Sequence, residues 1–155
     1  MDIQAMRIRV SHVGLCVADL ERSLRFYRDG LGFRETERYE SGPEVGSALE
    51  LNDVSHLGVF LERDGTTVEL LHFKSPVAIG PSDRRPMNQL GLTHLNFEVD
   101  DIDRAKERLI EFGGSIDDST RVRSAENGYE VLFCTDPDGI RIEFSRYFPP
   151  TSPER

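Results

Sequence analysis

The chain of 155 residues predicts an α+β fold in which two βαβββ modules form an incomplete barrel. A segment that begins with histidine occurs near the start of each half, at residues 12–20 and again at 94–102. An Asp-Gly segment carrying a glutamate occurs near the end of each half, at residues 64–70 and 138–144. The same order of patterns in both halves indicates an internal repeat, which strongly constrains the fold.

The repeat divides the chain into two modules and two connecting or terminal segments. The first module covers residues 8–73 and the second covers residues 92–147. Residues 74–91 form a linker rich in Pro and Gly, long enough for the second module to pair within the same chain or with a partner chain. The tail, residues 148–155, has no core-forming pattern, and we expect it to be flexible.

In the first module, a strand is predicted where apolar residues alternate with other residues at positions 10–17. His12 lies on the face opposite to the apolar one. Asp19 is a candidate N-cap for a helix with apolar residues at helical spacing, which ends at Gly30 and Gly32.

Three further strands complete the first module. They are predicted at residues 33–39, 56–62 and 66–73. Residues 40–47 contain two glycines and a proline and are predicted to be a loop, whereas 48–53 are ambiguous between strand and loop. Arg63-Asp64-Gly65 is typical of a hairpin turn between the last two strands.

The second module repeats this order. A strand at residues 92–99 is followed by a helix that Asp101 caps and that runs to about Phe112, before Gly113-Gly114. The remaining strands are predicted at residues 115–122, 129–135 and 140–147.

Strand parity places four side chains with metal-ligand chemistry on the faces opposite to the apolar ones. These residues are His12, Glu69, His94 and Glu143. Burying two carboxylates without partners is costly, and a cation offsets that cost. Two imidazoles and two carboxylates predict one divalent transition-metal ion per site, with Zn, Ni, Co, Mn and Fe all compatible.

Other polar residues are weaker candidates. Asn96 and Glu98 share the face of His94, and could contact substrate or lie on a solvated rim. His56 begins a strand after a turn and is predicted to lie at the surface. Cys16 and Cys134 lack a Cys-x-x-Cys spacing and are predicted to be buried, reduced thiols. Three arginines could contact an anionic substrate or be ordinary exposed charges: Arg121, Arg123 and Arg141.

The net charge of −9 comes from 28 acidic and 19 basic residues. This balance argues against a nucleic-acid partner and against binding to an anionic membrane. The first residues lack a cationic segment followed by an apolar run, and no run approaches the length of a membrane span. We therefore expect a cytoplasmic protein with a small-molecule substrate.

On these residues the chain resembles the vicinal oxygen chelate superfamily. This superfamily includes glyoxalase I, methylmalonyl-CoA epimerase, extradiol dioxygenases, fosfomycin-resistance enzymes and bleomycin-binding proteins. The matching segments are residues 12–27, 31–33, 67–71, 92–102 and 136–143. The resemblance implies metal ligation by His12, Glu69, His94 and Glu143, and a homodimer. It also implies that Glu69 and Glu143 act as an acid/base pair while an enediolate or enolate is stabilised.

The ligand set is similar to that of glyoxalase I, which implies a metal-dependent lyase or isomerase. Methylmalonyl-CoA epimerase usually has Gln at the position of Glu69. Glyoxalase I typically has Arg at the position of Cys16, and Asn where this chain has His72-Phe73, so these departures argue against a glutathione substrate. Two alternatives remain: a non-haem Fe(II) ring-cleavage dioxygenase, which uses two His and one Glu, and a non-catalytic antibiotic-binding resistance protein.

Overall fold

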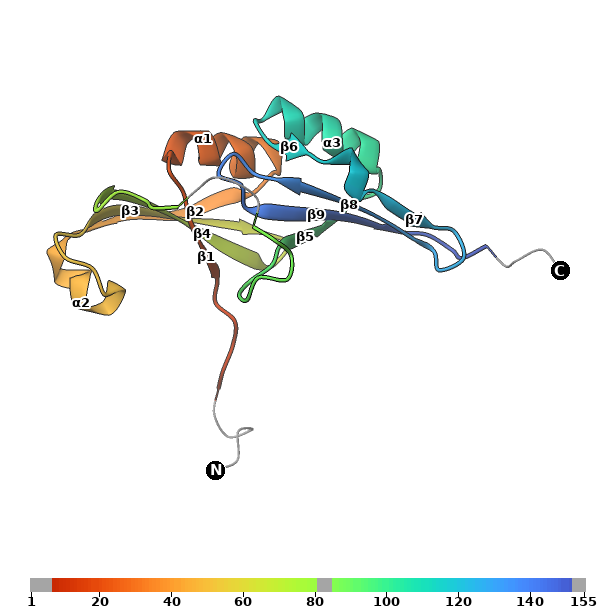
Figure 1. The fold of residues 1–155 in the computed structure, drawn as a ribbon. Helices are drawn as coiled ribbons and strands as arrows, with labels where there is room; N and C mark the ends of the chain where they lie inside the picture. The colour runs from red at the N-terminus through yellow and green to blue at the C-terminus, as the bar shows by residue number, and fades with distance from the viewer. Residues whose placement is uncertain (1–6, 81–84, 152–155) are drawn as a thin grey trace. The chain divides into compact units, whose positions relative to one another are not determined.

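The computed structural model describes residues 7–80 and 85–151, which form two compact units. As far as they are described, the first unit consists of Met1–Ala18 and Phe33–Ala78, and the second of Asp19–Gly32 and Ile79–Arg155. Each unit contains one open sheet, and the protein is α+β (Figure 1). The expectations for residues 1–6, for 81–84 of the linker and for 152–155 of the tail lie outside the described residues.

The sheet of the first unit has the strand order β1-β4-β3-β2. Its strands are β1 (Val13–Cys16), β2 (Arg34–Ser41), β3 (Ser55–Arg63) and β4 (Thr66–Ser75). β1 runs parallel to β4, and the other neighbours are antiparallel. Asp64 and Gly65 both have positive φ, at 51° and 79°, as a two-residue type I′ turn requires, so the predicted hairpin is confirmed.

The sheet of the second unit repeats this topology in the order β5-β9-β8-β6, with β7 also paired to β8. Its strands are β5 (Leu95–Glu98), β6 (Ser115–Ile116), β7 (Val122–Ser124), β8 (Tyr129–Thr135) and β9 (Arg141–Tyr147). The first strand again runs parallel to the last one. The two sheets therefore confirm the predicted repeat.

The apolar face of the first sheet is buried, as strand parity predicted for β4. Val59, Leu61, Val68 and Leu70 are each at most 1% exposed. In β1, Leu15 is buried, while Gly14 and Cys16 on either side of it are exposed. The face that carries the candidate ligand Glu69 is thus the opposite one.

The helix of the first repeat belongs to the second compact unit. It consists of α1 (Leu20–Leu24) and the π-helical turns η2 (Arg25–Gly30), and Asp19 caps it as predicted by accepting a hydrogen bond from the Arg22 amide. The Tyr27 hydroxyl donates to Asp136, and Arg108 donates to the carbonyl of Gly30. These bonds attach the helix to elements of the second repeat.

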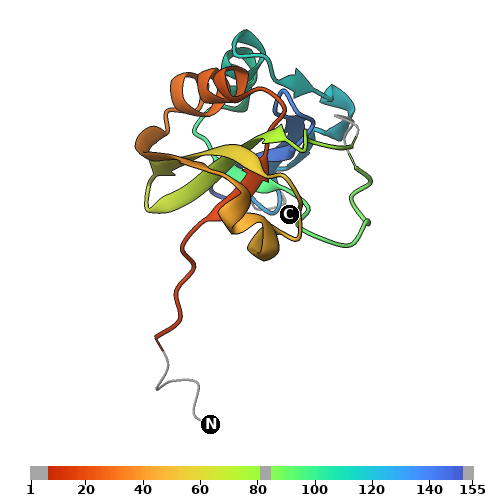
Figure 2. The ribbon, with the colours of Figure 1, turned by 90° about the vertical axis from the view of Figure 1, so that its left-hand side faces the viewer.

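The helix of the second repeat, α3 (Ile102–Glu111), is capped by Asp101 and lies beside α1 (Figures 1 and 2). Ile102 and Leu109 are its buried residues. Gly114 follows the helix, and a Cβ atom there would lie 2.0 Å from a Leu109 carbon. This close approach explains why the helix ends in a glycine pair. Among the described residues, no helix is long and apolar enough to cross a membrane.

The structure corrects the prediction for residues 40–53. β2 continues to Ser41, and the segment then forms a short 3-10 helix η3 (Pro43–Val45) and a helical turn α2 (Gly46–Leu49). Four residues are too few to show helical periodicity in the sequence. Gly46 is needed because a Cβ atom there would lie 2.7 Å from the Leu51 carbonyl oxygen.

The predicted strand at residues 115–122 is interrupted. It is replaced by β6 and β7, with a 3-10 turn η4 (Asp118–Thr120) between them. The Asp117 side chain accepts hydrogen bonds from the amide and hydroxyl groups of Ser119. Such local bonding from an aspartate competes with the sheet ladder, which explains the break.

Candidate functional site

In the first unit, His12 and Glu69 form a close pair. His12 Nε2 lies 3.3 Å from Glu69 Oε2, and His12 Nδ1 lies 3.1 Å from the hydroxyl oxygen of Ser11. The ring of Phe60 meets the imidazole edge-on, with centroids 5.2 Å apart. His12 just precedes β1, and Glu69 in β4 stands opposite Gly14 in β1, so the parallel pairing of the two strands brings the side chains together.

In the second unit, His94 and Glu143 form an equivalent pair. His94 Nε2 lies 2.9 Å from Glu143 Oε2, and His94 Nδ1 lies 2.9 Å from the hydroxyl oxygen of Thr93. The ring of Phe133 meets this imidazole edge-on as well, with centroids 5.5 Å apart. The pairing of β5 with β9 sets this contact, because Asn96 stands opposite Glu143.

The strand registers show that the two pairs occupy equivalent positions. Phe60 stands opposite Glu69 across β3 and β4, and Phe133 stands opposite Glu143 across β8 and β9. Each unit thus contains one histidine and one glutamate in contact. Within residues 7–80 and 85–151, the structure forms no group of three or more His, Cys, Asp or Glu side chains able to hold one ion.

The donor chemistry of each pair fits a divalent transition metal. In each pair Nε2 faces a carboxylate oxygen, so a proton or a cation must lie between the two atoms. With a metal ion at Nε2, Nδ1 would carry the proton and donate it to the neighbouring hydroxyl. Imidazole nitrogen and carboxylate oxygen are both ligands of Zn, Mn, Fe, Co and Ni. Glu69 is only 7% exposed, so its charge calls for compensation nearby.

The two glutamates differ in their second carboxylate oxygen. The Tyr39 hydroxyl donates a 2.6 Å hydrogen bond to Oε1 of Glu69. Burial and this bonded carboxylate raise the pKa of Tyr39 far above its ordinary value. Among the described residues, Glu143 has His94 as its partner and no second donor. Tyr39 has no direct signal in the sequence, because its position depends on how β2 pairs with β3.

His56 was predicted to lie at the surface, and that prediction is wrong. Its side chain is buried, with the residue 3% exposed. The imidazole stacks on Phe73 at 5.2 Å and meets the Tyr39 ring edge-on at 5.6 Å. His56 lies on the same face of β3 as Gly58, where the aromatic rings of β2 and β4 cover it.

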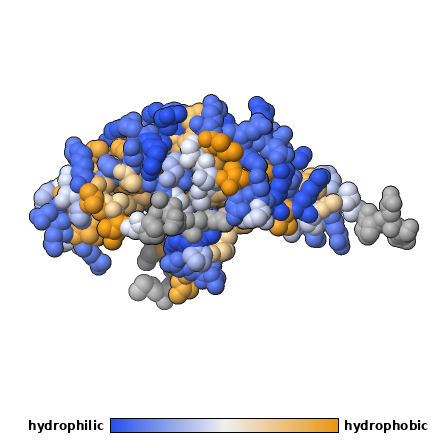
Figure 3. Space-filling model, turned by 45° about the horizontal axis from the view of Figure 1, so that its top comes forward, coloured by the Kyte–Doolittle hydropathy of each residue, from blue (hydrophilic) through white to orange (hydrophobic). Residues whose placement is uncertain are grey.

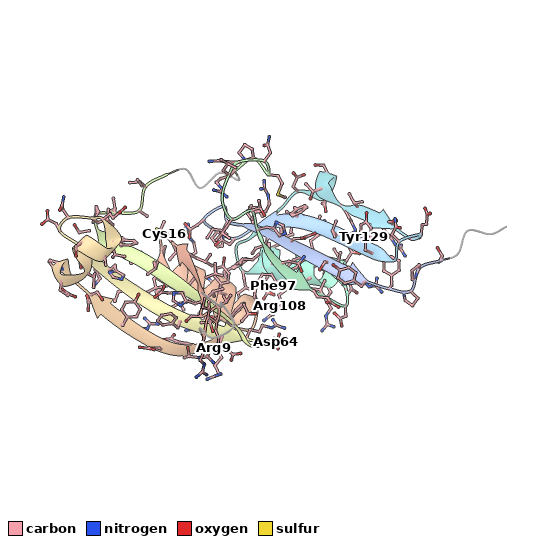
Figure 4. All side chains as sticks on the ribbon, turned by 90° about the horizontal axis from the view of Figure 1, so that it is seen from below. Arg9, Cys16, Asp64, Phe97, Arg108 and Tyr129 are labelled. Carbon is pink, nitrogen blue, oxygen red and sulfur yellow. The ribbon has the colours of Figure 1, made fainter. Side chains whose placement is uncertain are left out.

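The two cysteines have different environments and form no disulfide. Cys134 is buried as predicted, but Cys16 is exposed, which corrects the prediction for that residue. Cys16, labelled in Figure 4, has the same strand parity as His12 and therefore the same face. Cys16 pairs with Leu71 of β4. Because β1 is an edge strand, Cys16 has a neighbouring strand of that sheet on one side only.

The remaining candidates in the second unit have hydrogen-bond partners within the chain or are exposed to solvent. Arg121 donates to both Asp103 and Glu130. Asn96 is exposed and accepts a hydrogen bond from the Ser145 hydroxyl. Glu98 is exposed.

Two further arginines also contact other parts of the chain. Arg123 lies over the ring of Phe148, and Arg141 donates to the carbonyl of Arg85. The surface visible in Figure 3 is mainly hydrophilic, in keeping with the high content of charged residues.

Comparison with known proteins identifies relatives along almost the whole chain. The model of the glyoxalase/bleomycin resistance protein/dioxygenase superfamily matches residues 9–144. An ethylmalonyl-CoA/methylmalonyl-CoA epimerase of Cereibacter sphaeroides is 32% identical over 143 residues, covering 89% of this chain and 97% of the relative. A lactoylglutathione lyase of Neisseria meningitidis is 34% identical over 142 residues, covering 88% and 89%.

Solved structures agree on the fold. A glyoxalase family protein from Bacillus cereus has a TM-score of 0.80 at 22% identity, covering 93% of this chain and 97% of the other. The fosfomycin resistance protein FosX from Listeria monocytogenes, solved with Mn(II) and sulfate, has a TM-score of 0.56 at 18% identity, covering 92% and 95%. At these identities the likeness concerns the fold alone.

Proposed function

Because this chain belongs to the glyoxalase/bleomycin resistance protein/dioxygenase superfamily, we propose that it is a divalent-metal-dependent lyase or isomerase. Its reaction would move a proton on a carbon next to a carbonyl group. The observation that supports this proposal is the matched arrangement of two His–Glu pairs, each with a hydroxyl at Nδ1 and a phenyl ring against the imidazole. Relatives named as an epimerase and a lyase support an enzyme of this kind.

We propose His12, Glu69, His94 and Glu143 as the metal ligands, whether they meet within one chain or across two chains. The bound ion would stabilise negative charge on substrate oxygen as a Lewis acid. His12 and His94 would present Nε2 while the neighbouring hydroxyls fix their rings. This role needs no movement of the histidines during turnover.

Glu69 and Glu143 would perform the proton transfer. A carboxylate takes the proton from the carbon beside the carbonyl group, and the C–H electron pair moves into the enolate or enediolate. In an epimerase the proton returns to the opposite face of the same carbon. In a glyoxalase-like isomerisation it returns to the neighbouring carbon. Both outcomes balance without an oxidant or reductant.

The donor chemistry of the two pairs and the names of the relatives support a proposal for the substrate class. We propose a small molecule with two neighbouring oxygens, either a thioester of the malonyl type or an α-hydroxycarbonyl compound. Cys16 at the edge of the site face offers no cation for the carboxylates of glutathione. This supports a substrate other than a glutathione adduct.

We also propose that the protein is a homodimer. β1 and β5 each have one neighbour in their own sheets and leave one edge without a partner strand in that sheet. Proteins commonly cover such edges by pairing, either within the chain or with a second copy. Sedimentation measurements would decide the oligomeric state.

The first experiment is metal analysis of protein purified without chelators or metal-affinity resin. We expect about one divalent transition metal per site, and its loss in a His12→Ala/His94→Ala variant. Deuterium exchange from D₂O into a malonyl-type thioester and into α-hydroxycarbonyl compounds then tests the reaction. Glu69→Gln and Glu143→Gln should each reduce this exchange at least ~100-fold, within the usual range for acid/base groups.

Other outcomes would exclude the proposal. Oxygen consumption with a catechol, without proton exchange, would favour a dioxygenase. Tight binding of an antibiotic by protein that takes up no added Ni, Co, Zn or Mn would favour a resistance protein. Full exchange activity in both glutamate variants would show that the acid/base assignment is wrong.

A further inference from the structure

We propose that Tyr39 is a positioning residue that holds the carboxylate of Glu69 in one orientation. This inference rests on the proposed function, in which Glu69 is a metal ligand and part of the acid/base pair. Tyr39 lies in β2, which carries none of the four proposed ligands. Tyr39 would thus give Glu69 a hydrogen-bond donor in addition to His12, whereas Glu143 has only His94 among the described residues.

The carboxylate of Glu69 is held at both oxygens. Tyr39 donates to Oε1 at 2.6 Å, and His12 Nε2 lies 3.3 Å from Oε2. Glu69 is 7% exposed, so water has little access to replace a lost donor. Rotation of the Glu69 carboxylate would break the hydrogen bond from the Tyr39 hydroxyl. This hydrogen bond therefore favours one rotamer of Glu69.

The sheet holds the Tyr39 ring in place. Tyr39 stands opposite Gly58 across β2 and β3, and a Cβ atom on Gly58 would lie 2.2 Å from the ring carbons. The ring is flanked by Phe60 at 5.8 Å and by His56 at 5.6 Å between centroids. Gly58 thus leaves the space that lets the phenol lie flat across the sheet and reach Glu69.

The part of the second unit that the structure describes has no equivalent of this arrangement. Gly58 lies two residues before Phe60, which stands opposite Glu69, and it pairs with Tyr39. The equivalent position in the second sheet, two residues before Phe133, is Val131, and it pairs with Val122. Neither valine side chain can donate a hydrogen bond, and Glu143 has no second donor among the described residues. The two repeats therefore share the His–Glu pair, but only the first has a tyrosine hydroxyl bound to its glutamate.

This asymmetry indicates a specific role for Tyr39. A carboxylate fixed by a hydroxyl donor presents its other oxygen in a constant direction, which is how neighbouring groups tune metal ligands. Loss of the hydroxyl should weaken metal binding without unfolding the protein, since the ring and its packing remain in a Phe variant.

The test compares Tyr39→Phe with Tyr147→Phe, which removes the hydroxyl of a tyrosine that is 64% exposed. Co²⁺ affinity is measured by visible absorption on metal-free protein, together with the melting temperature. We expect Tyr39→Phe to weaken Co²⁺ binding about 10- to 100-fold in apo protein that stays folded and has at most a slightly lower melting temperature, and Tyr147→Phe to match wild type. Equal Co²⁺ affinity in wild type and Tyr39→Phe would overturn the role.

A second readout separates this inference from the proposed function. Absence of Co²⁺, Ni²⁺, Zn²⁺ and Mn²⁺ binding in the wild-type protein would refute the function alone. Crystal structures of metal-free wild type and Tyr39→Phe then decide the role of Tyr39. One Glu69 rotamer in wild type and several in Tyr39→Phe would support it, whereas the same single rotamer in both would overturn it.

Gly58→Ala provides an independent variant. The added methyl group would displace the Tyr39 ring, so the hydroxyl would leave Glu69 although Tyr39 is retained. We expect the same loss of Co²⁺ affinity as in Tyr39→Phe. Wild-type affinity in Gly58→Ala, with the ring displaced in its crystal structure, would also contradict the inference.

Discussion

Tyr27 and Asp136, 109 residues apart in the chain, meet inside the second unit, where the phenol donates a 2.9 Å hydrogen bond to Oδ2 of the carboxylate. Asp136 is 2% exposed, and its other oxygen accepts the amide hydrogens of Asp138 and Ile140. One side chain thus fixes the turn between β8 and β9 and attaches it to η2. Arg22 and Ser23 reinforce the attachment by donating to Asp138.

The buried carboxyl group makes stability depend on pH. Burial raises the pKa of Asp136 from 3.8 to about 6, although the hydrogen bonds that it accepts oppose this rise. Between these two values the folded protein holds a proton that the unfolded chain has lost. The free energy of unfolding therefore decreases as the pH rises through this window, by up to about 3 kcal/mol from this group.

Asp136→Asn should remove this dependence, because an amide is neutral at every pH and keeps a carbonyl oxygen for the two amide donors. Urea unfolding of both proteins from pH 4 to pH 7 provides the measurement. We expect the stability of the variant to rise relative to wild type across that range. Asp100→Asn, at an exposed position, serves as the control. Parallel curves for wild type and Asp136→Asn would refute this account.

The helix shows what the sequence could and could not predict. Apolar spacing and Asp19 identified the helix and its start, because caps and periodicity are local features. Its membership of the second unit depends on contacts between Tyr27 and Asp136 and between Arg108 and Gly30, which are distant in the chain. No local pattern encodes such contacts.

The candidate site also has a part that the sequence could predict and a part that it could not. The candidate ligands were found because each strand alternates with a period of two and the pattern recurs. Tyr39 was not found, because its partner depends on the register of β2, which shifts between Glu35 and Glu37. A slip of one residue would place Arg38 or Glu40 opposite Gly58 instead. The sequence could predict that this segment is a strand, but not the register in which the strand pairs with its neighbour.

Arg121 should contribute to stability rather than to substrate binding. Its guanidinium lies 2.8 Å from Glu130, which is 5% exposed, and 2.6 Å from Asp103. Arg121→Met would leave Glu130 buried without its cation, and we expect a loss of about 2 kcal/mol in the free energy of unfolding. The KM for a substrate found by the exchange assay should stay within about twofold of wild type.

The matched control for this prediction is Arg123→Met, which removes a cation from a phenyl ring near the surface. It should change the free energy of unfolding by no more than about 0.5 kcal/mol. A large rise in KM for Arg121→Met, with unchanged stability, would instead assign the arginine to substrate binding.

The space above Gly58 can be tested by a double-mutant cycle. Gly58→Ala should reduce stability by about 1–3 kcal/mol, because the methyl group overlaps the Tyr39 ring. In a Tyr39→Ala background the overlap disappears, and alanine should be neutral or favourable, since glycine is unfavourable within a strand. Chemical unfolding of the four proteins should give a coupling energy above about 1 kcal/mol. Additive effects would show that Gly58 serves another purpose.

The hydroxyls beside the two histidines should control metal affinity equally, because Ser11 and Thr93 occupy equivalent positions at 3.1 Å and 2.9 Å from the Nδ1 atoms. With a metal ion at Nε2, each hydroxyl would accept the Nδ1 proton and hold the ring in position. Ser11→Ala and Thr93→Ala should each weaken Co²⁺ binding by about tenfold, whereas Thr66→Ala, at an exposed strand position, should not. An effect of only one of the two variants would show that the repeated pairs are not equivalent in binding. The Tyr39 hydroxyl on Glu69 is one difference between the two units that could then be tested.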